Sequence, residues 1–190
     1  MVVNYPFLAR TQQISIRVHQ PPAGRLVAVL KIGHALGQIT FALPDADATK
    51  ALGARVARAS QPGTVILLRG PLGSGKTTFV EGFAQALGAG STASPTFVLA
   101  RLYRGGSMPV SHLDLYRLEA RNDVDALDLS HYMLHDGATL VEWPERAEGA
   151  WPKDRVEVEL AITGAARSAS IEGFGTGETL VAAVAPKQTS

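Results

Sequence analysis

The chain has 190 residues, of which 46% are hydrophobic and 18% are charged, a composition typical of a soluble globular protein that can bury a core. It contains no cysteine, so disulfides, thiolate zinc sites and cysteine nucleophiles are excluded. The sequence has neither the apolar run of about 18 residues that a membrane span requires nor a secretory signal, and we expect a cytoplasmic protein.

Charge is distributed unevenly along the chain. The net charge is +1, but residues 1–39 carry four basic residues and no acid, which leaves 14 basic and 17 acidic residues for the remainder. A mildly acidic body lacks the basic surface expected for direct nucleic-acid binding. The first residues have three interpretations: a disordered basic arm, a small packed extension, or a start codon assigned too far upstream. We divide the chain into an N-terminal extension (1–37), an organised domain (38–186) and a frayed tail (187–190).

The organised domain begins with a predicted strand over residues 38–43. Asp45 is a suitable N-cap for a helix over residues 45–59, because apolar residues recur on one face of that segment. The Gln-Pro-Gly sequence at residues 61–63 then turns the chain into a strand at residues 64–68. The continuous apolar run of this second strand is typical of a buried parallel strand.

Residues Gly70–Thr77 read Gly-Pro-Leu-Gly-Ser-Gly-Lys-Thr and match the phosphate-binding motif G-x-x-x-x-G-K-[ST] without mismatch. A helix is predicted next, because apolar residues recur at helical spacing over residues 79–87. Backbone N–H groups of such a loop, together with the helix N-terminus, bind phosphates. Lys76 would reach the β- and γ-phosphates, and the Thr77 hydroxyl would hold Mg²⁺. We therefore predict that the chain binds a nucleoside triphosphate.

The second half of the chain reads mainly as strands. A Gly-, Ser- and Thr-rich loop over residues 88–97 comes first, and Gly105 and Gly106 then provide a hairpin turn. The predicted elements are strands at residues 97–103, 110–115, 139–141 and 155–162, a short helix or two at 123–132, and further β-structure at 168–171 and 179–184.

Two acidic residues leave the ends of apolar strands, Asp114 and Glu142. In open α/β sheets, ligands gather beyond the carboxyl ends of the strands, where acids complete a magnesium shell and orient an attacking water. The alternative for each is a solvated strand-end carboxylate. Thr96 is either a hydroxyl that approaches the γ-phosphate or an ordinary loop threonine. Trp143 either fills the core or contacts a nucleobase or a partner protein, and Arg117 either neutralises phosphate charge or lies on the surface.

Four segments occur in the order and spacing of one protein family: Gly70–Thr78, Ser94–Phe97, His112–Leu118 and Val141–Pro144. Over roughly residues 38–185 the chain resembles the bacterial TsaE family, the P-loop ATPases of tRNA threonylcarbamoyladenosine biosynthesis. The resemblance implies action with the proteins TsaD and TsaB, and contact with tRNA only through them. Family members usually start close to the equivalent of Gln38, so the N-terminal extension lies outside the family pattern.

The resemblance also implies roles for individual residues. Lys76, Asp114 and Glu142 would be catalytic, and Thr77 and Glu142 would serve the metal ion. The residues expected to bind the nucleotide are Gly70, Leu72, Gly73, Ser74, Gly75, Lys76, Thr77, Thr78, Thr96 and Trp143.

We expect an α/β P-loop NTPase fold, with a central, mostly parallel sheet, helices on both faces and an antiparallel portion from the later strands. The expected cofactors are ATP and Mg²⁺, and the expected reaction is hydrolysis to ADP and phosphate, slow in the isolated protein because no internal arginine finger is evident. Two alternatives stay open. One is a small-molecule P-loop kinase, and the other is a non-catalytic switch whose bound nucleotide only orders a protein surface.

Overall fold

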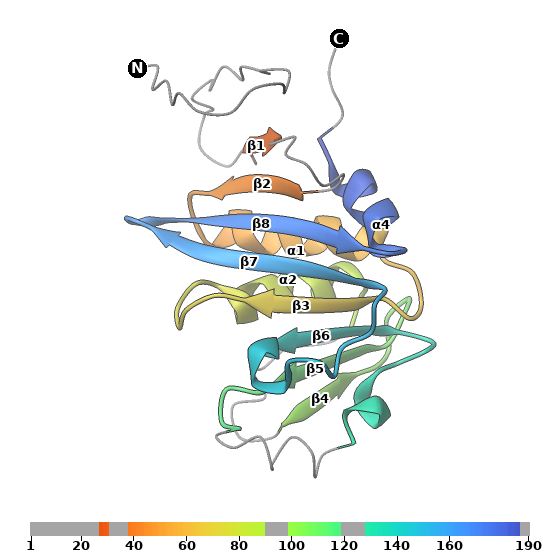
Figure 1. Ribbon diagram of the computed structural model, residues 1–190. Coiled ribbons are helices and arrows are strands. Elements are labelled where there is room, and N and C mark those ends of the chain that lie inside the picture. The colour runs from red at the N-terminus through yellow and green to blue at the C-terminus, as the bar shows by residue number, and fades with distance from the viewer. Residues whose placement is uncertain (1–26, 31–37, 90–98, 119–127, 187–190) are drawn as a thin grey trace, which may run out of the picture.

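The computed structural model describes residues 27–30, 38–89, 99–118 and 128–186 (Figure 1). The strands are β1 (Val27–Leu30), β2 (Gln38–Leu43), β3 (Val65–Arg69), β4 (Ala100–Tyr103), β5 (Val110–Asp114), β6 (Ala138–Glu142), β7 (Arg155–Thr163) and β8 (Ala166–Phe174). The α-helices are α1 (Ala46–Ala59), α2 (Lys76–Ala86) and α4 (Gly177–Val184), and η1 (Leu129–Tyr132) and η2 (Pro144–Ala147) are single 3₁₀ turns.

The strands form one mixed sheet in the order β1-β2-β8-β7-β3-β6-β5-β4. The four central strands β7, β3, β6 and β5 are parallel neighbours, whereas every pairing outside them is antiparallel. The predicted antiparallel portion from the later strands is present as the β7–β8 pair. The early strands β1 and β2 and the β4–β5 hairpin are antiparallel too, so the sheet is mostly parallel only at its centre.

One face of the sheet carries the helical layer. In α1, the side chains of Ala48, Leu52 and Val56 repeat every four residues and are buried. The helix begins as expected, since the Asp45 side chain accepts a hydrogen bond from the backbone N–H of Ala48 at 2.7 Å. Helix α1 packs against both α2 and α4, and all three join one apolar core with strands from β2 to β8.

The opposite face of the sheet carries a smaller apolar cluster. This cluster contains strand residues such as Val141, together with Leu129 of η1, Ala147 of η2 and the partly buried Trp151. Among the described residues, only these 3₁₀ turns and their flanking loops cover it. Within the described residues the α-helices lie on the other face, and the expectation of helices on both faces stays a prediction.

A second correction concerns residues 179–184, which were expected to be β-structure. They belong to helix α4, where Leu180, Val181 and Val184 are buried. A short apolar run fits a buried strand and a buried helix equally well by its pattern. The predicted hairpin around Gly105 and Gly106 is confirmed, because β4 and β5 pair antiparallel on either side of it.

Two further predictions concern segments that lie partly outside the described residues. Of the helix predicted at 123–132, only η1 is described, and residues 119–127 lie outside the described part. Strand β1 lies inside the predicted N-terminal extension and pairs with β2, while the domain boundary at residue 38 stays a prediction. No helix in the described ranges has the length and apolar character needed to cross a membrane.

Candidate active site

The loop between β3 and α2 is built on glycine conformations. Gly70, Gly73 and Gly75 have φ angles of 132°, 77° and 104°, a region that side chains strongly disfavour. At Gly70 the packing adds a second requirement, because a Cβ atom there would lie 2.1 Å from the carbonyl oxygen of Leu160 in β7. The spacing of glycines in the sequence therefore matches a real steric need.

Lys76, the first residue of α2, folds back over this loop. Its Nζ donates hydrogen bonds to the carbonyl oxygens of Gly70 at 2.7 Å and Pro71 at 3.1 Å. The same Nζ lies 3.9 Å from the centroid of the Trp143 ring, a cation–π contact. Burial lowers the pKa of the Lys76 ammonium, and the nearby carboxylates, Glu142 foremost, act in the opposite direction.

The two strand-end acids are brought together as predicted. Asp114 and Glu142 are register partners at the ends of the parallel strands β5 and β6. Glu142 Oε1 accepts a hydrogen bond from Thr77 Oγ1 at 3.0 Å, so the predicted magnesium pair is in direct contact. The same oxygen lies 2.9 Å from His112 Nε2.

Asp114 has a different environment. Its Oδ1 accepts a hydrogen bond from the backbone N–H of Tyr116 at 3.1 Å. Burial raises the pKa of its carboxyl group above the usual range, and the charge of Glu142 adds to the rise, while the Tyr116 hydrogen bond opposes it. Burial therefore disfavours the ionised form of Asp114.

These groups line a cavity of about 400 Å³. Its lining residues are Leu72, Gly73, Gly75, Lys76, Thr77, Thr78, Asp114, Tyr116, Arg117, Glu142 and Trp143. Two predicted residues do not line it: Gly70 lies against β7, and Ser74 is fully buried, with a hydroxyl that has no hydrogen-bond partner among the described residues. Thr96 lies outside the described residues.

Trp143 occupies an unusual backbone conformation. Its φ angle is 60°, and within the described ranges no other residue except glycine has a positive φ. Its ring lies 5.0 Å from the Tyr116 ring, centroid to centroid. A strained backbone conformation of this kind persists only where surrounding contacts hold it in place, and it is found at functional sites more often than elsewhere.

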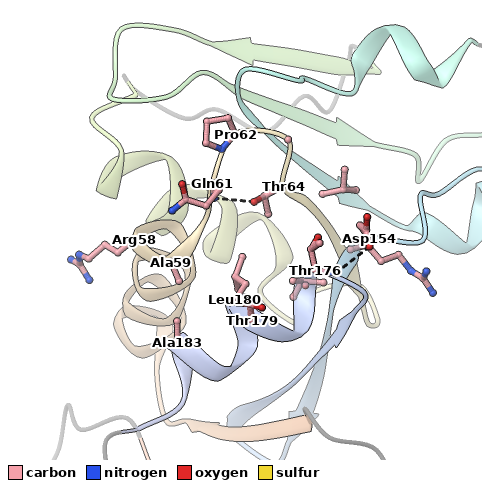
Figure 2. A pocket seen from close by; sticks show the side chains of 15 residues that line it. Arg58, Ala59, Gln61, Pro62, Thr64, Asp154, Thr176, Thr179, Leu180 and Ala183 are labelled. Atoms are coloured by element: carbon pink, nitrogen blue, oxygen red, sulfur yellow. Dashed lines mark hydrogen bonds between the residues drawn. The ribbon is translucent and has the colours of Figure 1, made fainter.

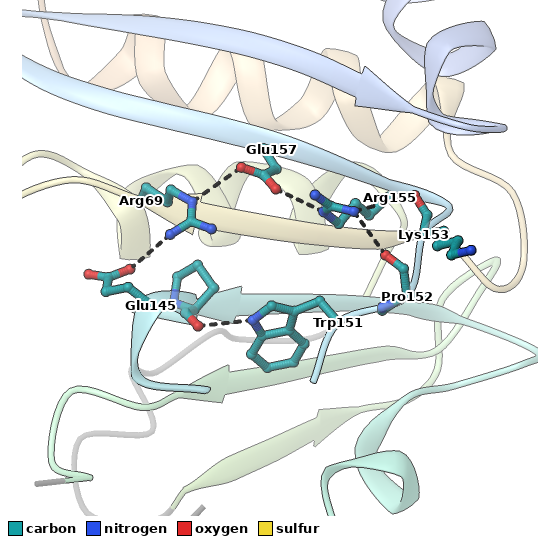
Figure 3. A network of polar contacts seen from close by, with 8 residues as sticks. Arg69, Glu145, Trp151, Pro152, Lys153, Arg155 and Glu157 are labelled. Atoms are coloured by element: carbon teal, nitrogen blue, oxygen red, sulfur yellow. Dashed lines mark hydrogen bonds and ion pairs between the residues drawn. The ribbon is translucent and has the colours of Figure 1, made fainter. Parts of the chain in front are cut away.

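Polar contacts beyond the cavity fix the turn η2 that follows Trp143 (Figure 3). Trp151 donates from Nε1 to the carbonyl oxygen of Pro144 at 2.9 Å. Arg69, the last residue of β3, pairs with Glu157 of β7 at 3.2 Å and with Glu145 of η2 at 3.7 Å. These contacts connect the strand before the glycine loop to the turn that carries Trp143.

Three residues that line the cavity or contact its lining residues were not assigned a role from the sequence. Tyr116 lies in a quoted motif but was given no part in the site, and His112 was treated the same way. Arg167 of β8 donates from Nε to the carbonyl oxygen of Gly73 at 3.1 Å. No local pattern marks this arginine, because its position depends on the pairing of β7 with β8.

A larger cavity, of about 640 Å³, lies at the opposite ends of β3 and β7 (Figure 2). Arg58 and Thr64 are among its lining residues, and on another side Asp154 accepts a hydrogen bond from the backbone N–H of Thr176 at 3.1 Å. This cavity includes none of the residues predicted from the sequence to bind nucleotide or metal or to act in catalysis, so size alone does not identify the site.

Comparison with known proteins identifies the family. The family model for the "Threonylcarbamoyl adenosine biosynthesis protein TsaE" matches residues 43–169. The tRNA threonylcarbamoyladenosine biosynthesis protein TsaE of Synechocystis is 46% identical over 111 residues, which are 56% of this chain and 70% of that protein. Its Bacillus subtilis counterpart is 36% identical over 128 residues, which are 67% of this chain and 80% of that protein.

A solved structure agrees with these relatives. The crystal structure of Bacillus subtilis YdiB matches with a TM-score of 0.69 and 30% identity, and the match covers 80% of this chain and 97% of that one. The resemblance inferred from the four motif segments is thus confirmed by sequence and by fold. The chain belongs to the TsaE family of tRNA threonylcarbamoyladenosine biosynthesis proteins.

Proposed function

We propose that this protein is a magnesium-dependent ATP hydrolase that serves threonylcarbamoyl modification of tRNA adenosine. The observation that carries the proposal is the convergence of Lys76, Thr77, Asp114 and Glu142 on one cavity at the end of the glycine loop. Family membership supplies the pathway. The pattern of a phosphate-binding cation beside two acids supports the reaction type.

The residues present fit a magnesium nucleotide. The glycine loop and the N-terminus of α2 offer backbone N–H groups and a positive dipole end for phosphates, and Lys76 adds a full positive charge. The Thr77 hydroxyl and the Glu142 carboxylate are oxygen donors of the kind that Mg²⁺ prefers, and they already contact each other at 3.0 Å. Bound Mg²⁺ would supply charge neutralisation on the phosphate oxygens.

The reaction is an in-line displacement at the γ-phosphate, in which a bond from water oxygen to phosphorus forms and the bond to the β-phosphate oxygen breaks. Asp114 orients the water and accepts its proton. Lys76 stabilises the negative charge that develops on the phosphate oxygens. We expect slow turnover by the isolated protein and faster turnover with TsaD and TsaB, because a partner can provide the cation that the transition state requires. Contact with tRNA occurs through these partners in the cytoplasm.

The experiment that tests this function is single-turnover hydrolysis of ATP, with and without TsaD and TsaB. We expect release of phosphate to water, accelerated by the partners. Phosphate transfer to a metabolite would support the small-molecule kinase instead. Binding of ATP without turnover under any condition would support the non-catalytic switch.

The two acids separate the chemistry from the metal. Asp114→Asn should keep ATP affinity within a few fold and lower hydrolysis by about 10²-fold or more, since a group that positions water acts mainly in the transition state. Glu142→Gln should weaken Mg²⁺ dependence and hydrolysis together. Asp136→Asn is the matched control, because this exposed acid lies beyond the other end of β6. Full activity in both site variants would mean that these acids are bystanders.

A further inference from the structure

A line of buried polar side chains runs from the candidate site into the sheet. It starts at Glu142 and passes through His112 of β5 to Tyr103 of β4. His112 is 0% exposed and Glu142 only 3%, so solvent does not stabilise the carboxylate charge and protein donors must do so. Tyr103 Oη lies 3.4 Å from His112 Nδ1, and the two rings are stacked at 6.3 Å.

Strand pairing fixes this line. His112 is the register partner of Leu140 in β6, two residues before Glu142 on the same face of the sheet. On its other side, His112 is the register partner of Arg101 in β4, two residues before Tyr103. The side chains therefore reach one another diagonally across three neighbouring strands.

The hydrogen-bond partners determine which ring nitrogen carries the proton. A carboxylate only accepts, so His112 Nε2 must donate to Glu142 Oε1, and in the neutral ring Nδ1 is then an acceptor. Tyr103 supplies the matching donor, with its hydroxyl oxygen 3.4 Å from His112 Nδ1. Every donor in the line thus points toward Glu142.

We propose that His112 is a positioning residue for the Glu142 carboxylate. It holds this carboxylate in the orientation in which it accepts a hydrogen bond from the Thr77 hydroxyl and can help to bind magnesium. Both hydrogen bonds converge on Oε1, so the rotation of the carboxylate is restricted from two sides. Groups that orient a metal-binding carboxylate from behind typically change metal affinity or activity by about 10- to 100-fold when removed. The role in magnesium binding rests on the proposed function, whereas the hydrogen-bond line does not.

The first test reads the tautomer directly. Nitrogen-detected NMR of the wild-type protein, without nucleotide, should show a proton on His112 Nε2. Tyr103→Phe removes the donor to Nδ1 and should shift that nitrogen's resonance. A proton on Nδ1 alone in the wild-type protein would overturn the proposal, because Nε2 could not then donate to Glu142.

The second test measures the Mg²⁺ concentration that gives half-maximal tightening of ADP binding, by calorimetry. His112→Leu should raise this Mg²⁺ concentration by about tenfold or more. Tyr103→Phe should raise it by a smaller factor of about five or less. His112→Gln should raise it by at most about threefold, because the glutamine amide keeps a hydrogen-bond donor. Affinity for ADP in EDTA should stay unchanged. A role for His112 in core packing alone would predict no rescue by glutamine.

Ser111→Ala is the matched control, because Ser111 is buried on the same strand and points to the other face of the sheet. Equal Mg²⁺ dependence in His112→Leu and the wild-type protein would overturn the proposal. If the wild-type protein shows no Mg²⁺-dependent nucleotide binding, the proposed function fails and the magnesium role of His112 with it. The tautomer result would still show whether His112 holds Glu142.

Discussion

Asp114 and Glu142 are register partners at adjacent strand ends, yet the fold holds their carboxylates by different means. Glu142 is buried and accepts from a hydroxyl and an imidazole, whereas Asp114 is only partly buried and accepts from a backbone N–H. The same edge of the sheet thus presents one acid that is fixed by side chains and one whose ionised form is disfavoured by burial.

This difference predicts an effect of pH on stability. Because the pKa of Asp114 is raised in the folded protein, its stabilising contribution is fully present below the unfolded pKa and is lost as pH rises through the folded pKa. Asp114→Asn is neutral at every pH, so it should raise the melting temperature at neutral pH and give no gain in acid. Thermal melts between acid and neutral pH measure this.

Asp128→Asn serves as a control of opposite sign. Hydrogen bonds from Ser130 lower the pKa of Asp128, so its contribution is present above the unfolded pKa and lost as pH falls through the folded one. The variant should melt at a lower temperature than the wild-type protein at neutral pH, with a smaller difference in acid. A higher melting temperature in both variants at neutral pH would contradict the assignment to burial.

Lys76→Ala should weaken binding of Mg·ATP by about 10- to 100-fold, the usual range for losing hydrogen bonds from a charged group. Isothermal titration calorimetry measures this directly. Lys50→Ala is the control, because Lys50 is also a helical lysine but pairs with Glu81 on the surface at 3.1 Å. Equal affinities in the wild-type protein and Lys76→Ala would contradict phosphate binding at the glycine loop.

Nucleotide binding should change the fluorescence of Trp143. The ring lines the cavity and lies 3.9 Å from Lys76 Nζ, so a change at that ammonium alters the field on the indole. The chain has two tryptophans, and the other, Trp151, donates to Pro144 outside the cavity. The change should persist in Trp151→Phe and disappear in Trp143→Phe. Loss in Trp151→Phe alone would place the ligand elsewhere.

Gly70→Ala should destabilise the protein far more than Gly164→Ala. Both glycines have positive φ, but a Cβ at Gly164 meets nothing within 4 Å, whereas one at Gly70 meets the Leu160 carbonyl. The backbone conformation alone costs about 1 kcal/mol, or roughly 2–4 °C in melting temperature for a chain of this size. Calorimetric melting should show at least twice that loss for Gly70→Ala. Similar losses in melting temperature for the two variants would mean that β7 shifts at Leu160 to accommodate the added Cβ atom.

Local patterns predicted the parts of the site that are local in the chain. The loop at residues 70–77 is a contiguous motif, and Asp114 and Glu142 each follow an apolar run that ends at a strand terminus. Parallel pairing then aligns the two acids without further information. The family pattern added specificity to this reading.

Contacts between segments that are far apart in the chain could not be predicted from the sequence. Strand β2 pairs with β8 across most of the chain, and no local signal marks that neighbour. The contact of Arg167 with Gly73 depends on the pairing of β8 with β7. Helix α4 was misread because Thr179–Val184 is short and apolar, and only its packing against α1 and β8 decides its conformation.

The dependence of the glycine loop on β7 and β8 has a consequence during translation. Gly70 packs on the Leu160 carbonyl, and Gly73 is held by Arg167, both made some 90 residues after the loop itself. A nascent chain that has released only the motif therefore lacks the strands against which the loop is shaped. We therefore expect the loop to reach its folded shape only after the β7–β8 hairpin has left the ribosome.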